Sequence, residues 1–245
     1  VDLNVHWAHW PRGFWPWKTL GGLVKALKGC GITRALISSP ESILYPDPVE
    51  TDRILLTRIK PFPFLTPVAT LNPAVLNFQK QIAGKDFVAF RLVPAFWDCS
   101  LKEKTVRKLL TLIQERKRLL LIQMRLEDER SQFYPLQVPA PKITDLLALA
   151  KNFPSVKMVV LNVYFDEAVQ LARQPNVWVD LSFLERFQTL KSLLTVLPVE
   201  KVVFGSHAPF LYPEAALAKV MCARIPERVK GAILFRNSQR WLSIG

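Results

Sequence analysis

The sequence is poor in several features that would narrow its class at once. It has three cysteines in 245 residues, and no two of them form a C-x-x-C pair. Free thiols in a reducing compartment are therefore favoured over a disulfide framework. No apolar run approaches the ~18–20 residues that span a bilayer, and Walker, Rossmann and nucleophile-elbow motifs are missing. We expect a cytoplasmic protein with no membrane partner.

Basic residues are plentiful but dispersed. The net charge of +13 raises the question of a nucleic-acid partner. The lysines and arginines are scattered over expected helices, as at Lys102, Lys104, Arg107 and Lys108, and neither an RNA-binding motif nor a helix-turn-helix signature occurs. We expect a solvated basic surface, no nucleic acid, and a small-molecule substrate or ligand of anionic character. The sequence does not indicate an oligomeric state.

What the sequence does contain is a regular alternation of short apolar runs with amphipathic stretches, which is typical of βα units and a parallel sheet. Eight units in 245 residues match the roughly 250 residues of a (β/α)8 TIM barrel. We predict one such domain over residues 1–245, in which residues 226–245 form a C-terminal helical cap. The expected strands are 2–6, 34–38, 63–69, 87–92, 119–123, 157–161, 177–181 and 201–204. The expected helices are 18–28, 49–59, 73–84, 101–117, 142–153, 165–173, 185–197 and 213–224.

Polar side chains gather where these strands end. In a βα barrel the active site lies at the carboxyl ends of the strands, and no other part of the sequence concentrates so many polar groups. The candidates that we select there are Asn4, His6, Arg91, Gln123, Arg125, Glu127, Asn162 and His207. The loop after the first strand adds four tryptophans, which would form a packed plug, a lid or an apolar subsite.

The two ends of the chain carry motifs that resemble a known superfamily. Residues 2–6 read Asp-Leu-Asn-Val-His and residues 204–209 read Phe-Gly-Ser-His-Ala-Pro. They are similar to the Asp-X-His-X-His and Gly-Ser-Asp-X-Pro strands of the amidohydrolase-related (amidohydrolase family 2) metal-dependent hydrolases. Residues 175–182, Pro-Asn-Val-Trp-Val-Asp-Leu-Ser, match its seventh strand without a gap. The resemblance implies an amidohydrolase-type TIM barrel.

The same resemblance places the superfamily's metal ligands on altered residues. Its paired strand-one histidines fall on Asn4 and His6, and its strand-five ligand falls on Gln123. Its strand-six histidine falls on Asn162, and its catalytic aspartate falls on His207. The chain therefore resembles a divergent branch with replaced metal ligands.

These replacements weaken the expected metal site. A hydrolytic metal needs about three protein ligands, and the amide oxygens of Asn and Gln are neutral, weak donors for zinc. We assign no metal ligands outright and expect no binuclear centre. If a zinc-like divalent metal is bound, His6 and His207 would hold it together with a carboxylate from Glu127, Asp128 or Asp180.

For function, the resemblance implies a hydrolase or a carbon–carbon lyase acting at the barrel mouth on a small anionic substrate. His207 would be the general acid or base, and His6 its catalytic partner, because histidine exchanges protons near neutral pH. The remaining candidates would contact substrate, and the two arginines suit a carboxylate or phosphate. The alternative is a catalytically silent barrel that binds a ligand or a protein partner.

Overall fold

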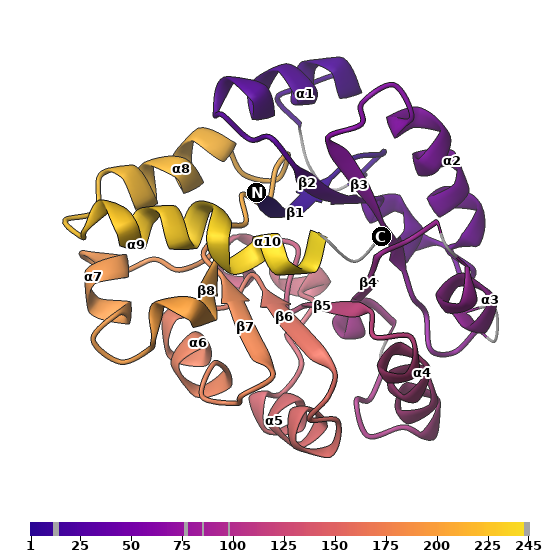
Figure 1. Cartoon of the computed structure of the whole chain (residues 1–245). Helices are drawn as coiled ribbons and strands as arrows, with labels where there is room; N and C mark the ends of the chain where they lie inside the picture. Colours follow the sequence, from indigo (N-terminus) through magenta and orange to yellow (C-terminus); the bar gives the residue numbers. More distant parts are fainter. Residues whose placement is uncertain (12–14, 76–77, 85, 98, 243–245) are drawn as a thin grey trace.

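The computed structural model describes residues 1–11, 15–75, 78–84, 86–97 and 99–242. Its eight strands are parallel and follow one another in the sheet in chain order, β1 to β8. Figure 1 shows the strands as a central ring with helices around it. The predicted (β/α)8 TIM barrel is confirmed.

The strands are β1 (Asp2–His6), β2 (Ala35–Ser38), β3 (Leu65–Thr70), β4 (Ala89–Leu92), β5 (Leu119–Gln123), β6 (Lys157–Leu161), β7 (Val177–Asp180) and β8 (Val202–Val203). The outer helices are α1 (Leu20–Gly29), α2 (Val49–Ile59), α3 (Phe78–Ala83), α4 (Lys104–Glu115), α5 (Ile143–Asn152), α6 (Phe165–Leu171), α7 (Thr189–Leu193) and α8 (Pro213–Met221). At the end of the described chain come α9 (Glu227–Gly231), a π-helical turn (Ala232–Arg236) and α10 (Asn237–Leu242).

The strands match their predicted ranges closely, but several elements are shorter than expected. β8 has two residues, because the chain leaves the ladder to pack Gly205 against β1 and β7. Helix α7 begins only at Thr189, after Gln188 adopts a left-handed backbone with φ 51°. Helix α3 is described from Phe78 onward, and part of the helix predicted over 73–84 lies outside the described residues.

The barrel closes between its first and last strands. The amide of Leu3 donates to the carbonyl of Phe204 at 3.0 Å, and the amide of His6 donates to the carbonyl of Ala208 at 2.7 Å. Val5 and Ala208 form an isolated parallel bridge. Residues from opposite ends of the sequence therefore meet at the mouth, as closure of an eight-stranded sheet requires.

Alternation along the strands separates two apolar layers. One lies between the sheet and the helices. The other fills the inside of the barrel and includes Leu36, Val68, Leu121, Val159 and Val203. Helix α10 crosses one end of the barrel in Figure 1, and its Trp241 joins this inner cluster. In the described part of the chain, no helix has the length and apolar character to cross a bilayer.

Above the inner apolar layer lies a set of hydrogen-bonded polar side chains, which we call the polar layer. It comprises Asn4, His6, Ser38, Arg91, Gln123, Asn162 and Asp180, each at most 1% exposed. In β1 the apolar Leu3 and the polar Asn4 and His6 all face the interior, although alternation would separate them. The register of β1 against β2 shifts between Asp2 and Val5, and such an irregularity re-aims the side chains that follow it.

Candidate functional site

The guanidinium of Arg91 lies at the centre of the polar layer. Its Nη1 shares two N–H groups among three acceptors, Asn4 Oδ1 at 3.1 Å, His6 Nε2 at 2.8 Å and Gln123 Oε1 at 2.5 Å. Burial lowers the pKa of Arg91 to about 9, against the raising effect of Asp180 and Asp2. The group remains a cation at neutral pH. Its Nε and Nη2 are buried and have no hydrogen-bond partner among the described residues.

The two amides that accept from Arg91 also donate onward. Asn4 Nδ2 donates to Asn162 Oδ1 at 2.6 Å and to Asp180 Oδ2 at 2.9 Å. Gln123 Nε2 donates to the carbonyl of Arg125 at 2.7 Å. These contacts fix which end of each amide faces the guanidinium, since nitrogen donates and oxygen accepts. The amides therefore link the cation to strands β5, β6 and β7.

Asp180 anchors the far side of this network. Its Oδ1 accepts from the backbone of Asn162 at 2.8 Å, and its Oδ2 accepts from Ser182 Oγ at 2.7 Å. Burial raises the pKa of Asp180 to about 6, although these donors oppose the shift. Gly205 packs so closely that a Cβ there would lie 2.5 Å from Asp180 Oδ2. This position therefore requires glycine.

The two candidate histidines lie together at the carboxyl end of the barrel. The ring centroids of His6 and His207 are 5.0 Å apart, with the rings nearly perpendicular. His6 accepts from Arg91 at Nε2, so its proton is on Nδ1, which faces Ser38 Oγ at 3.3 Å. Burial, with Arg91 and His207 nearby, lowers the pKa of His6 well below its usual value.

The two ring nitrogens of His207 differ in their surroundings. Its Nε2 lies 2.7 Å from the carbonyl oxygen of Leu126, and because a carbonyl only accepts, Nε2 carries the proton. Nδ1 is then a lone-pair acceptor, and it has no partner among the described residues. Burial lowers the pKa of His207 to about 3, so the imidazole is neutral. The ring borders a cavity of about 180 Å³ that Glu127, Phe183 and Phe210 also line.

Aromatic rings cover the histidine pair. Phe210 stacks on His207 at a centroid distance of 4.7 Å and meets His6 edge-on at 5.3 Å. Trp10 and Trp15 contact the same phenylalanine at 5.7 and 5.8 Å. The sequence did not single out Phe210, although it follows the Gly-Ser-His motif directly, because nothing in that motif says where the next ring points.

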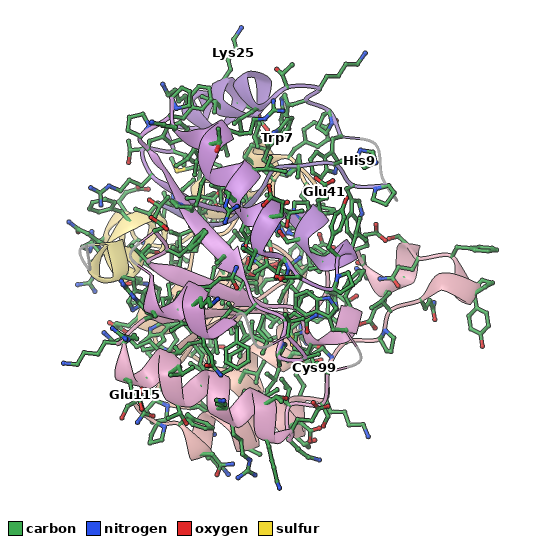
Figure 2. All side chains as sticks on the ribbon, turned by 90° about the vertical axis from the view of Figure 1, so that its right-hand side faces the viewer. Trp7, His9, Lys25, Glu41, Cys99 and Glu115 are labelled. Atoms are coloured by element: carbon green, nitrogen blue, oxygen red, sulfur yellow. The ribbon has the colours of Figure 1, made fainter. Side chains whose placement is uncertain are left out.

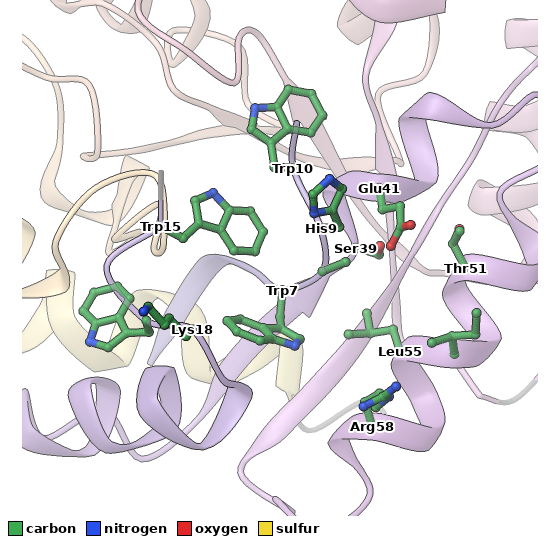
Figure 3. A pocket seen from close by; sticks show the side chains of 13 residues that line it. Trp7, His9, Trp10, Trp15, Lys18, Ser39, Glu41, Thr51, Leu55 and Arg58 are labelled. Carbon is green, nitrogen blue, oxygen red and sulfur yellow. The ribbon is translucent and has the colours of Figure 1, made fainter. Parts of the chain in front are cut away.

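A second, larger cavity opens beside this cover. It has a volume of about 450 Å³ and is lined by Trp7, Trp10, Trp15, Trp17, Lys18, Ser39, Glu41, Leu55 and Arg58, among others. We call it the tryptophan cavity. Figure 3 shows the indole rings on one side and side chains of helix α2 on the other. Trp7, His9 and Glu41 lie on the same side of the molecule in Figure 2.

Arg125 and Glu127 follow β5 and are engaged by residues that follow β6 and β1, respectively. Arg125 makes two bonds of 2.8 Å to the carboxylate of Glu167 and lies 3.9 Å from the ring centre of Tyr164. Glu127 accepts from Trp10 Nε1 at 2.9 Å. Glu167, which the sequence did not single out, thus holds Arg125 while also accepting from the amide of Tyr164. The predicted substrate contacts of Arg125 and Glu127 stay predictions.

The polar layer does not fit a metal ion. Among the described residues, no group of three or more His, Cys, Asp or Glu side chains converges as a metal site. Asn4, His6 and Gln123 present their acceptor atoms to a guanidinium, and His207 directs Nε2 to a carbonyl instead. The predicted set of two histidines and one carboxylate is therefore not assembled by this part of the chain.

The neutral state of His207 has a measurable consequence. Its pKa of about 3 in the folded protein lies below the ~6.5 of an unfolded chain, so between these values the unfolded state binds the extra proton. Stability from this group is present above pH 6.5 and is lost as the pH falls. Replacing His207 should therefore remove this loss, so that the free energy of unfolding of the variant falls less at acid pH than that of the wild type.

We expect the difference in unfolding free energy between wild type and His207→Asn to shift in favour of the variant by about 2 kcal/mol between pH 7 and pH 5. Urea titrations at pH 7, 6 and 5 measure this difference, in which buried carboxyls common to both proteins cancel. His9→Asn, which alters an exposed side chain, is the control. A difference that does not change with pH would contradict a neutral, buried His207.

Comparison with solved structures shows the same fold in enzymes of low sequence identity. A dihydroxybenzoic acid decarboxylase from Polaromonas sp. JS666, with bound manganese and an inhibitor, superposes with a TM-score of 0.75 at 13% identity, covering 99% of this chain and 96% of that one. The 5-carboxyvanillate decarboxylase from Sphingomonas paucimobilis superposes with a TM-score of 0.73 at 17% identity, covering 93% of this chain and 84% of that one. A probable 2-pyrone-4,6-dicarboxylic acid hydrolase from Acinetobacter baumannii superposes with a TM-score of 0.69 at 12% identity, covering 98% of this chain and 97% of that one.

At sequence identities of 12–17%, these comparisons show a shared fold. Among curated proteins, no sequence matches this chain significantly. The family model described as amidohydrolase matches residues 41–244, a range that contains every strand except the first two. With the closed barrel and the strand-end motifs, this match shows that the chain belongs to the amidohydrolase family.

Proposed function

We propose that this protein is an enzyme that acts on a small anionic molecule at the carboxyl end of the barrel, as a carbon–carbon lyase or a hydrolase. The observation that carries the proposal is Nδ1 of His207, which has no hydrogen-bond partner among the described residues. A buried, neutral imidazole whose other nitrogen is fixed by the carbonyl of Leu126 is oriented to accept a proton. An unpartnered buried acceptor is otherwise costly.

Arg91 supports an anionic substrate. Its Nε and Nη2 lack acceptors among the described residues, and together they form the edge of a guanidinium that binds a carboxylate through two parallel bonds. An anionic group beside His207 would also raise the pKa of its imidazole toward the neutral range. His207 would then exchange a proton with substrate, and His6, bonded to Arg91, would keep the cation in place.

The tryptophan cavity supplies a route and a binding surface. Its volume of about 450 Å³ falls in the usual range for small-molecule sites, and indole faces suit a planar ring. Lys18 and Arg58 add positive charge to its wall. Phe210 touches Trp10 and Trp15 on one side and His207 on the other, so rotation of this one ring would connect the cavity to the histidine.

The fold neighbours favour the same substrate class. The three compared structures are named for enzymes of dihydroxybenzoic acid, 5-carboxyvanillate and 2-pyrone-4,6-dicarboxylic acid, which are all ring carboxylates. Their identities of 12–17% transfer no activity by themselves. They define the panel to be tried first.

The test is a turnover assay with this panel of ring carboxylates, following carbon dioxide release and ring absorbance. We expect turnover of at least one acid and none of its neutral amide. In parallel, Arg58→Gln should weaken binding of that acid several-fold, whereas Arg116→Gln, an exposed residue outside the cavity, should not. Binding of the acids without turnover of any of them would contradict the enzyme and favour the ligand-binding alternative.

A further inference from the structure

The polar layer of this barrel is built around an organic cation, whereas a fold neighbour contains a metal ion. The dihydroxybenzoic acid decarboxylase contains manganese. In the present chain, the superfamily resemblance places Asn4, His6 and Gln123 at metal-ligand positions, and their acceptor atoms converge on one nitrogen, Nη1 of Arg91. Two of the three are amides instead of imidazoles.

We propose that the guanidinium of Arg91 takes the place of the metal ion and makes the centre a permanent, metal-independent cation site. The first argument is distance. The contacts to Asn4 and His6 measure 3.1 and 2.8 Å, within the range of N–H donors, and the contact to Gln123 is shorter, at 2.5 Å. A zinc ion binds imidazole nitrogen at about 2.0–2.1 Å, so the acceptors surround a group larger than a bare ion.

The second argument is the chemistry of the acceptors. An amide oxygen is a weak ligand for a transition metal but a good acceptor from a guanidinium. Its NH2 group then donates elsewhere, as Asn4 does to Asp180 and Gln123 does to the Arg125 carbonyl. The amides at positions 4 and 123 therefore belong together with the arginine at position 91: the amides accept from the guanidinium, as imidazole ligands would bind a metal. Amides without the arginine would leave buried oxygens without a donor.

The third argument is charge and access. Arg91 is 1% exposed in a layer that also contains the buried carboxyl of Asp180, so the layer already holds a cation near a carboxyl group. A divalent ion entering beside Arg91 would meet both a like charge in a poorly screened interior and a filled position. Retaining Arg91 should thus block metal binding even if good ligands are restored around it.

The experiment compares two engineered proteins with one difference. Asn4→His with Gln123→His adds two imidazoles to His6, and the first protein keeps Arg91 while the second also carries Arg91→Ala. After incubation with zinc chloride and dialysis, elemental analysis should find close to one zinc per chain in the second protein and less than about a tenth of that in the first. Circular dichroism confirms that both are folded.

Equal zinc binding by the two proteins would overturn the proposal. So would the absence of zinc binding by the second protein, which carries Arg91→Ala, if that protein is folded. Stoichiometric zinc or manganese in the wild type would do the same. Should the triple variant not fold, Arg91→Ala alone provides a second measurement. Millimolar n-propylguanidinium should raise its Tm, whereas n-propylammonium should not, and equal shifts with the two cations would contradict the placement. These outcomes do not depend on the turnover assay, which tests the reaction.

Discussion

Replacing Gly205 with alanine is expected to destabilise the protein by about 3 kcal/mol, a large loss for one methyl group. The new Cβ would lie 2.5 Å from Asp180 Oδ2 and 3.0 Å from the Cβ atoms of both Asp180 and Asn4. The carboxylate cannot simply turn away, because Asn4 and Ser182 hold that oxygen at 2.9 and 2.7 Å. The clash would therefore disturb the whole polar layer.

Chemical unfolding of Gly205→Ala against wild type measures the loss. Gly29→Ala is the matched control, because a Cβ there meets nothing within 4 Å and the residue is the last of helix α1, where alanine is at least as good as glycine. A loss in unfolding free energy below about 1 kcal/mol for Gly205→Ala would contradict this prediction. It would show that the side chains of the polar layer can rearrange around the new methyl group.

Removing the imidazole of His207 should have the largest effect on catalysis. Once a substrate is identified, His207→Asn is expected to lower kcat about 10²–10⁴-fold, which is the usual contribution of a positioned acid or base. Asparagine is the suitable replacement because residue 207 has φ 58°, a left-handed conformation that asparagine tolerates. The backbone turn that aims the side chain is thereby kept.

Steady-state kinetics with the active acid provides the measurement, with Arg116→Gln, an exposed residue outside the tryptophan cavity, as the control. We expect KM to change little for His207→Asn, since the binding groups of the cavity remain. A kcat within about threefold of wild type would exclude proton transfer by this residue, whatever the substrate.

The fold was readily predicted from the sequence, and the reason is its periodicity. The ranges of β1, β5 and β6 agree with prediction residue for residue, because each is a short apolar run between helical patterns. β8 was overestimated, since Phe204 looks like strand by its neighbours yet leaves the ladder. That departure depends on the contact of Gly205 with two other strands, which no local pattern records.

The site was predicted less completely, for a related reason. That His6 and His207 approach each other follows from barrel closure, and their rings lie 5.0 Å apart. The position of Arg91 does not follow, because its three contacts join β4 to β1 and β5. They also depend on the shift in register within β1. Sequence reasoning proposed Arg91 as a substrate contact without seeing that the strand-end amides already bind it.

Closure of the barrel by its two most distant strands has a consequence for how the chain reaches this state. The bonds from Leu3 to Phe204 and from His6 to Ala208 join segments that lie far apart in the sequence. Contacts of such long sequence separation form late and slow folding. Until β8 emerges from the ribosome, β1 presents an unpaired edge that is open to other chains. The nascent protein is therefore expected to be most prone to aggregation, and most in need of chaperones, during translation of its last strand.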